Sequence, residues 1–96
     1  MTTSVTTIPT EHGSRYLQQL CKHFAHKIPV EFDPTRGHIA FPMGGVDLAA
    51  DAAGLTITVR PTSAEKTEEL RDVVARHLVR FAFREEFAFD WQDRAA

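Results

Sequence analysis

The sequence predicts an α+β domain in which a curved antiparallel sheet carries two helices on one face. Apolar and polar residues alternate over residues 28–60, with short turns between the alternating runs, as in a meander of four strands. On either side, segments 11–26 and 63–83 place apolar residues three and four positions apart, as amphipathic helices do. Residues 2–8 are rich in β-branched side chains and end before Pro9, which indicates a first strand. The predicted order is therefore β-α-β-β-β-β-α.

The bulk composition limits the classes of protein to which the chain can belong. Its 96 residues are 43% hydrophobic and 25% charged, which is typical of one globular domain over residues 1–96. With 11 basic and 13 acidic residues the net charge is −2, which argues against nucleic acid as a partner, because phosphates attract a basic excess. The single cysteine rules out an internal disulfide, and the N-terminus lacks the features of a signal peptide. No apolar run approaches the roughly 20 residues that span a bilayer, so we expect a cytoplasmic protein without membrane contact.

Signals at the element ends support this order. Thr10 is expected to cap the first helix, and Pro29 helps to end it. Thr62 and Glu65 have the spacing of a capping box ahead of the second helix. Residues 87–91 alternate aromatic with small or acidic side chains, which predicts a short C-terminal edge strand, with an extended arm as the alternative.

The turns of the meander define a register that the hydrophobic pattern can test. We take PTRG, GG and DAAG as the three turns and let each close its hairpin directly. The apolar strand residues then fall in three rows on one face, as a one-sided core requires. The rows are Val30, Phe41, Leu48, Ile57; Phe32, Ile39, Ala50, Leu55; and Ile28, Met43, Val46, Val59. The same order of elements occurs in TATA-binding-protein-like folds, including the C-terminal domain of phosphohexomutases, a likeness that concerns the fold alone.

The segment LCKHFAHK places Cys21, His23 and His26 within six residues, as a zinc site would. At about 100° per residue, Cys21 lies about 160° from His23 and about 140° from His26 around the helix, so one ion cannot contact all three. We interpret Cys21 as a small buried side chain. The two histidines either hold an ion together with a carboxylate from elsewhere or, with Lys27, bind a ligand or complement the helix dipole.

A second cluster is predicted on the sheet face opposite the core. The register places His38 directly across from Asp33 in one neighbouring strand and from Asp51 in the other. Two carboxylates would fix the imidazole tautomer and create a hard-metal site or a proton acceptor. The alternative is that both aspartates only serve their turns. The rest of this face consists of small or charged residues: Glu31, Ala40, Pro42, Asp47, Ala49, Thr56, Thr58 and Arg60.

The second helix adds further candidates. His77 lies on its apolar stripe and is interpreted as a hydrogen-bonded core or interface residue. Arg80 and Arg84 fall on the outer side, where they form a solvated face or an anion site. The chain has no Gly-rich phosphate loop, nucleophile elbow, paired-cysteine zinc motif or dinucleotide fingerprint. There is thus no positive signal for an enzyme, and no cofactor can be named.

The segments RYLQQLCKHFAHKIPVEF and HLVRFAFREEFAFDW resemble a small family of bacterial proteins, the domain of unknown function numbered 2218. The likeness covers nearly the whole chain. The positions that carry it are His23, His26, Lys27, Glu31, Phe32, His77, Arg80, Phe81, Arg84, Glu85 and Trp91. Family members are often encoded beside, or fused to, siderophore-interacting flavoproteins. The resemblance therefore implies an accessory role in iron or siderophore handling, and it assigns no role to any residue.

We therefore expect a non-enzymatic, cytosolic accessory domain that binds a siderophore-interacting flavoprotein, another protein or a small ligand. The expected ligand-binding residues are His23, His26, Lys27, Glu31, Arg80 and Arg84. One alternative is a metal-binding or metal-dependent protein. Its ligands would be His23 with His26, or Asp33, His38 and Asp51. The other alternative is a structural module that forms a homodimer through the polar sheet face.

Overall fold

The computed structural model describes residues 2–82 and 87–95, and it confirms the predicted order of elements. The strands are β1 (Thr2–Pro9), β2 (Val30–Phe32), β3 (Arg36–Phe41), β4 (Gly44–Asp51), β5 (Gly54–Pro61) and β6 (Gln92–Ala95). The helices are α1 (Gly13–Ala25) and α2 (Thr67–Phe81), the second preceded by a 3₁₀ turn, Ala64–Lys66.

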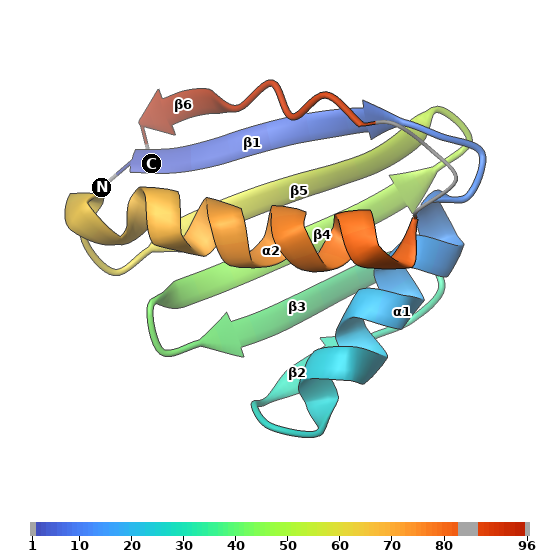
Figure 1. Cartoon of the computed structure of the whole chain (residues 1–96), viewed down its shortest axis with the longest axis horizontal. Helices are drawn as coiled ribbons and strands as arrows, with labels where there is room; N and C mark the ends of the chain where they lie inside the picture. The colour runs from blue at the N-terminus through green and yellow to red at the C-terminus, as the bar shows by residue number, and fades with distance from the viewer. Residues whose placement is uncertain (1, 83–86, 96) are drawn as a thin grey trace.

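All six strands form one sheet in the order β2-β3-β4-β5-β1-β6, and every neighbouring pair is antiparallel. Both helices lie on the same face, with α1 across β2, β3 and β4 and with α2 along β5 (Figure 1). No helix in the described part of the chain covers the opposite face, which we call the open face (Figure 1). Neither of these two helices is long and apolar enough to cross a membrane.

The core lies between the sheet and the two helices, as the alternating pattern predicted. Residues with no exposed surface include Leu17, Leu20, Ile39, Val46, Leu55, Ile57, Val59, Leu70 and Leu78. Cys21 is buried in the same layer, and burial raises the pKa of its thiol to about 11. A thiol that stays protonated is a poor metal ligand, so the interpretation of Cys21 as a small buried side chain is confirmed.

The predicted register is right for one hairpin and wrong for two. Leu48 lies opposite Ile57, as expected for β4 and β5. The turn between β3 and β4, however, is formed by residues 42–43 and not by the two glycines, so Ile39 pairs with Val46. Gly44 instead begins β4 with a φ of +144°, a conformation that favours glycine.

The pairing of β2 with β3 is displaced as well. Val30 lies opposite Ile39 instead of Phe41, because Gly37 belongs to β3 and not to the turn before it. Each displacement is an even number of residues, so the apolar face is preserved while the neighbours change. Phe32, which we expected in a core row, is 38% exposed at this edge of the sheet.

The helix starts differ from the prediction at both caps. The capping box does not form: the hydroxyl of Thr62 donates to the carbonyl of Met43 at 3.1 Å, and α2 begins at Thr67 without a side-chain cap. Thr10 does not cap α1, which begins at Gly13 after His12; Thr10 Oγ1 instead accepts a hydrogen bond from the His12 N–H at 3.1 Å, ahead of the helix. Phe83, the predicted end of the second helix, lies outside the described residues.

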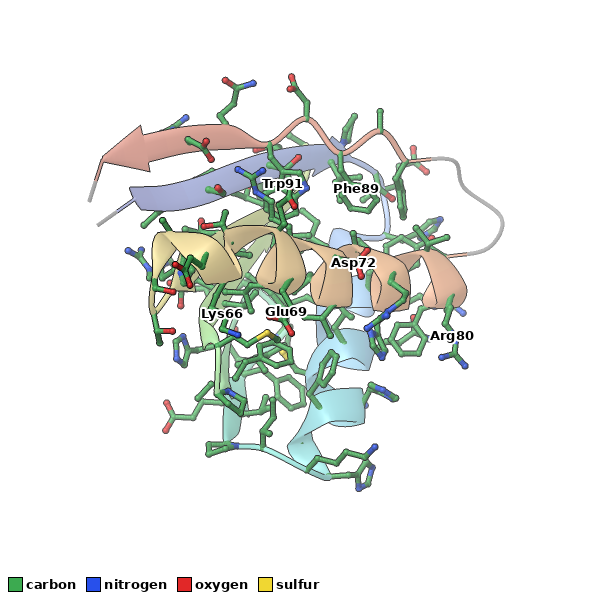
Figure 2. All side chains as sticks on the ribbon, turned by 60° about the vertical axis from the view of Figure 1, so that its left-hand side comes forward. Lys66, Glu69, Asp72, Arg80, Phe89 and Trp91 are labelled. Atoms are coloured by element: carbon green, nitrogen blue, oxygen red, sulfur yellow. The ribbon has the colours of Figure 1, made fainter. Side chains whose placement is uncertain are left out.

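The aromatic tail joins the sheet later than predicted. Residues 87–91 are extended but unpaired, and the C-terminal strand is β6, which pairs with β1. Figure 2 shows Phe89 and Trp91 lying between this tail and α2, where both pack against the core. The Arg71 guanidinium lies 5.6 Å from the Trp91 ring centre and forms an ion pair with Asp93. The tail therefore closes the side of the core beside β1.

Candidate functional site on the open sheet face

The corrected register brings a different set of polar residues together on the open face. His38 lies opposite Glu31 in β2 and opposite Asp47 in β4. The predicted row of Asp33, His38 and Asp51 does not form. The turn at residues 42–43 moves the partner of His38 along β4 from residue 51 to residue 47, and the start of β3 moves its other partner from residue 33 to residue 31.

The two displaced aspartates serve their turns, which was the alternative interpretation. Asp33 Oδ1 accepts hydrogen bonds from the N–H groups of Thr35 and Arg36, both at 2.8 Å, and these backbone bonds lower the pKa of Asp33. Asp51 Oδ1 accepts from the N–H groups of Ala53 at 2.8 Å and Gly54 at 3.0 Å. Among the described residues, no three His, Cys, Asp or Glu side chains converge as a metal site.

Asp47 is the centre of the cluster that does form. Its Oδ1 accepts a hydrogen bond from His38 Nδ1 at 2.6 Å, and its Oδ2 accepts one from Arg60 Nε at 2.7 Å. Partial burial acts to raise the pKa of Asp47, but the hydrogen bonds and charges of Arg60 and His38 outweigh it and hold the pKa below its ordinary value. Because the ionised carboxylate can only accept, His38 Nδ1 carries the proton of this hydrogen bond.

The cluster borders a shallow hollow of about 630 Å³ in the open face. Ala49 is exposed and lines the hollow, while Glu31 and Arg36 stand along it from β2 and β3. None of the ion pairs between described residues involves Glu31 or Arg36. The hollow therefore offers a free carboxylate and a free guanidinium beside the His38 and Arg60 side chains.

Gly45 explains why the His38 ring can lie against the sheet. A Cβ at this position would lie 2.9 Å from His38 Cε1. Only a residue without a side chain leaves room for the imidazole to turn toward Asp47 in this way. Sequence reasoning placed Asp47 and Arg60 on this face, but it did not identify the hydrogen bonds that Asp47 accepts from Arg60 and from His38.

Asp47→Asn is expected to lower stability in a pH-dependent manner. Because the pKa of Asp47 is lowered from 3.8 by folding, its stabilising contribution is fully present above that value and is lost as the pH falls through the lower folded pKa. At neutral pH we expect a loss of no more than about 1 kcal/mol, since the three side chains are partly exposed. Urea unfolding of both proteins should show this difference vanishing in acid. Asp72→Asn, on the exposed side of α2, is the charge-matched control, and a difference that persisted in acid would contradict the assignment.

The predicted ligand residues on the helices lie on another side of the molecule. His23, His26 and Lys27 are exposed near the end of α1, and Arg80 is exposed on α2. Two rings of α2 contact His23: the ring of His77, with centres 5.1 Å apart, and the ring of Phe81, at 5.6 Å. Glu31 lines the open-face hollow instead, and Arg84 lies outside the described residues. The structure thus divides the predicted ligand residues between two surfaces.

His77 occupies the place that its position on the apolar stripe predicted. The ring is partly buried, and its Nδ1 lies 2.6 Å from the carbonyl oxygen of Val73. This confirms a hydrogen-bonded interface histidine. Its contact with His23 was missed, because the packing of two distant helices leaves no local signal in the sequence.

The fold and this site together define a small α+β domain with one uncovered polar sheet face. The chain belongs to a bacterial family described as "Uncharacterized protein conserved in bacteria (DUF2218)", whose family model matches residues 5–92. A solved relative, described as the NMR structure of PA4090 from Pseudomonas aeruginosa, is similar in sequence and fold. It shares 34% identity, 96% of each chain is covered, and the TM-score is 0.80. A comparison with curated proteins found no match.

Proposed function

We propose that this protein is a small binding module whose open sheet face takes a polar small molecule carrying both an acidic group and a hydrogen-bond donor. The observation that carries the proposal is the cluster of His38, Asp47 and Arg60 beside the hollow. Asp47 orients both of its partners before any ligand arrives. Such preorganisation reduces the entropy lost on binding.

The chemistry of the hollow selects the ligand. Arg60 uses Nε to hold Asp47, so its terminal nitrogens and the Arg36 guanidinium remain to bind a carboxylate or another planar anion. The Glu31 carboxylate is an acceptor, and so is the His38 Nε2 atom when the ring is neutral; both suit a hydroxyl or N–H group of the same ligand. Hydroxycarboxylates and catechol-type acids combine both features.

Binding is favoured over covalent catalysis by the types of side chain present. The described residues that line the hollow include no Ser, Cys or Lys, and neither of its two threonines, Thr56 and Thr58, is hydrogen-bonded to His38 as an activated nucleophile would be. We therefore assign His38 a hydrogen-bonding role toward the ligand.

The setting that we propose is iron or siderophore handling in the cytoplasm, with a siderophore-interacting flavoprotein as the partner protein. Support comes from the family resemblance and from ligand chemistry, since many iron chelators present carboxylate, catechol or hydroxyl groups. A partner that delivers or removes such a ligand would need access to the open face, which no described helix covers.

The test is an NMR titration of the ¹⁵N-labelled protein with citrate, acetate, glycerol and a ferric tris-catecholate complex. Citrate combines carboxylates with a hydroxyl, while acetate and glycerol each offer one of the two. We expect citrate or the tris-catecholate to shift the amide signals of His38, Ala49 and Thr58 more strongly than acetate or glycerol does. Ala49→Arg should weaken binding by about tenfold or more. Ala52→Arg in the following turn adds the same charge outside the hollow and should leave binding unchanged.

Three outcomes would contradict the proposal. The first is that no probe shifts these signals, and the second is that Ala52→Arg weakens binding as much as Ala49→Arg does. The third is a dimer in light scattering that Ala49→Arg separates, because the open face would then be a homodimer interface. Binding of citrate without the tris-catecholate would retain the hollow as a ligand site and argue against the siderophore setting.

A further inference from the structure

Two imidazoles meet where the helices pack together, on the opposite side of the sheet from the hollow. His23 of α1 and His77 of α2 have ring centres 5.1 Å apart and ring planes tilted by 43°. Phe24 holds both rings, at 4.9 Å from each, and Phe81 lies 5.6 Å from the His23 ring. Both histidines belong to regular helices, so neither ring depends on a loop for its position.

The tautomer of His77 is fixed by its hydrogen bond. Its Nδ1 lies 2.6 Å from the Val73 carbonyl oxygen, and a carbonyl only accepts, so Nδ1 carries the proton. In the neutral ring, Nε2 therefore carries the lone pair. Histidines that bind metals usually donate their other N–H to a carbonyl or carboxylate in this manner.

His23 is the exposed member of the pair, so an ion can reach it from solvent. Desolvation lowers its pKa, and Coulombic interactions with His77, Lys27, Arg80 and His26 lower it further. A neutral imidazole is the form that coordinates a metal ion.

We propose that His23 and His77 together bind a late first-row divalent metal ion, of the class of Zn²⁺, Cu²⁺ or Ni²⁺. The spacing fits: with metal–nitrogen bonds of about 2.0–2.1 Å, two imidazoles on one tetrahedral ion have ring centres about 5.2 Å apart. Since no third His, Cys, Asp or Glu among the described residues joins them, the remaining positions of the ion go to water or to an external ligand. Imidazole nitrogen is a preferred donor for these ions, and Cu²⁺ should bind most tightly.

The basic residues around His23 and His77 affect which form of the metal binds. His26 and Lys27 follow the end of α1 and Arg80 lies on α2, and each lowers the pKa of His23 through Coulombic interaction. These groups repel a bare cation and so reduce its affinity. They also favour an anionic ligand at the open positions of the ion, so a metal–anion complex should bind better than the metal alone.

The test uses tag-free protein titrated with Zn²⁺ or Ni²⁺ and followed through the imidazole nitrogen resonances. Zn²⁺ should shift the nitrogen signals of His23 and His77 while those of His12 and His26 stay in place. His23→Gln and His77→Gln should each weaken binding by about tenfold or more, whereas His26→Gln should not. Because His23 is exposed, its variant should keep the fold, which circular dichroism can verify. Binding should also weaken on acidification, because protons compete for the same nitrogens.

Other results would overturn the proposal. Loss of binding in His26→Gln but not in His77→Gln would place the ion along α1. Unchanged imidazole signals at saturating Zn²⁺ would rule out the pair altogether. Lys27→Gln should bind Zn²⁺ at least as tightly as the wild type. A loss of binding in this variant would mean that the basic cluster binds the anion and not the metal.

Discussion

Gly37→Ala is expected to destabilise the fold by about 1–3 kcal/mol, which is the usual effect of overpacking a core. A Cβ at Gly37 would lie 2.7 Å from the sulfur of Cys21 and 3.3 Å from a methyl group of Leu17. Both of these side chains are fully buried on α1, so the helix would have to move away from β3. Urea unfolding measures the loss.

Two variants show whether the loss has this cause. Cys21→Ala in the Gly37→Ala background removes the closest contact, so it should recover part of the stability. Gly45→Ala is the same substitution on the open face, where the new methyl group meets the His38 ring at 2.9 Å. Because that ring can swing into solvent, Gly45→Ala should change stability little and break the bond between His38 and Asp47. Equal destabilisation by the two glycine variants would contradict this account.

Trp91→Ala is expected to cost about 2–3 kcal/mol, less than a fully buried tryptophan because the ring is partly exposed. The ring packs against the core, stacks on Phe89 with centres 6.4 Å apart, and lies beneath the Arg71 guanidinium. Its removal should also loosen β6, since the tail aligns that strand with β1. The variant lacks the only tryptophan of the chain, so tryptophan fluorescence cannot report its unfolding. Far-UV circular dichroism is the measurement to use instead.

Asp90→Ala is the matched control for the tail. Asp90 is exposed one residue earlier, and its carboxylate accepts only a hydrogen bond from the Gln92 side chain at 3.0 Å. Its replacement should change stability by less than about 0.5 kcal/mol. If Trp91→Ala were as mild as this control, the tail would not contribute to the core.

The faces of the strands were predictable because side chains alternate with a period of two, whereas the register depended on how glycines were used. Gly44 and Gly45 together suggest a hairpin turn, but the turn lies two residues earlier in the chain, at residues 42–43. Gly44 is needed for its positive φ, and Gly45 makes room for His38. A turn, an unusual backbone angle and a close approach of another atom all favour glycine. The sequence alone therefore cannot show which of these three reasons applies at a given glycine.

The difference between local geometry and long-range pairing also explains what was predictable at the candidate sites. Helical geometry correctly separated Cys21 from the two nearby histidines, because positions within one helix follow from its pitch. The partner of His38 depended on the register, so Asp33 and Asp51 were chosen in place of Glu31 and Asp47. The pairing of His23 with His77 depends on how two helices cross over the sheet. Side-chain packing sets that crossing, and it is not a local property of either segment.

The place of β1 in the sheet has a consequence for folding kinetics. β1 pairs with β5 and β6, so this strand has no partner until residues 54–61 have been made. The hairpins of β2 to β5 join neighbouring segments and can close early, because short loops cost less entropy. Insertion of β1 between β5 and β6 then comes late, and it should set the rate at which the native sheet appears.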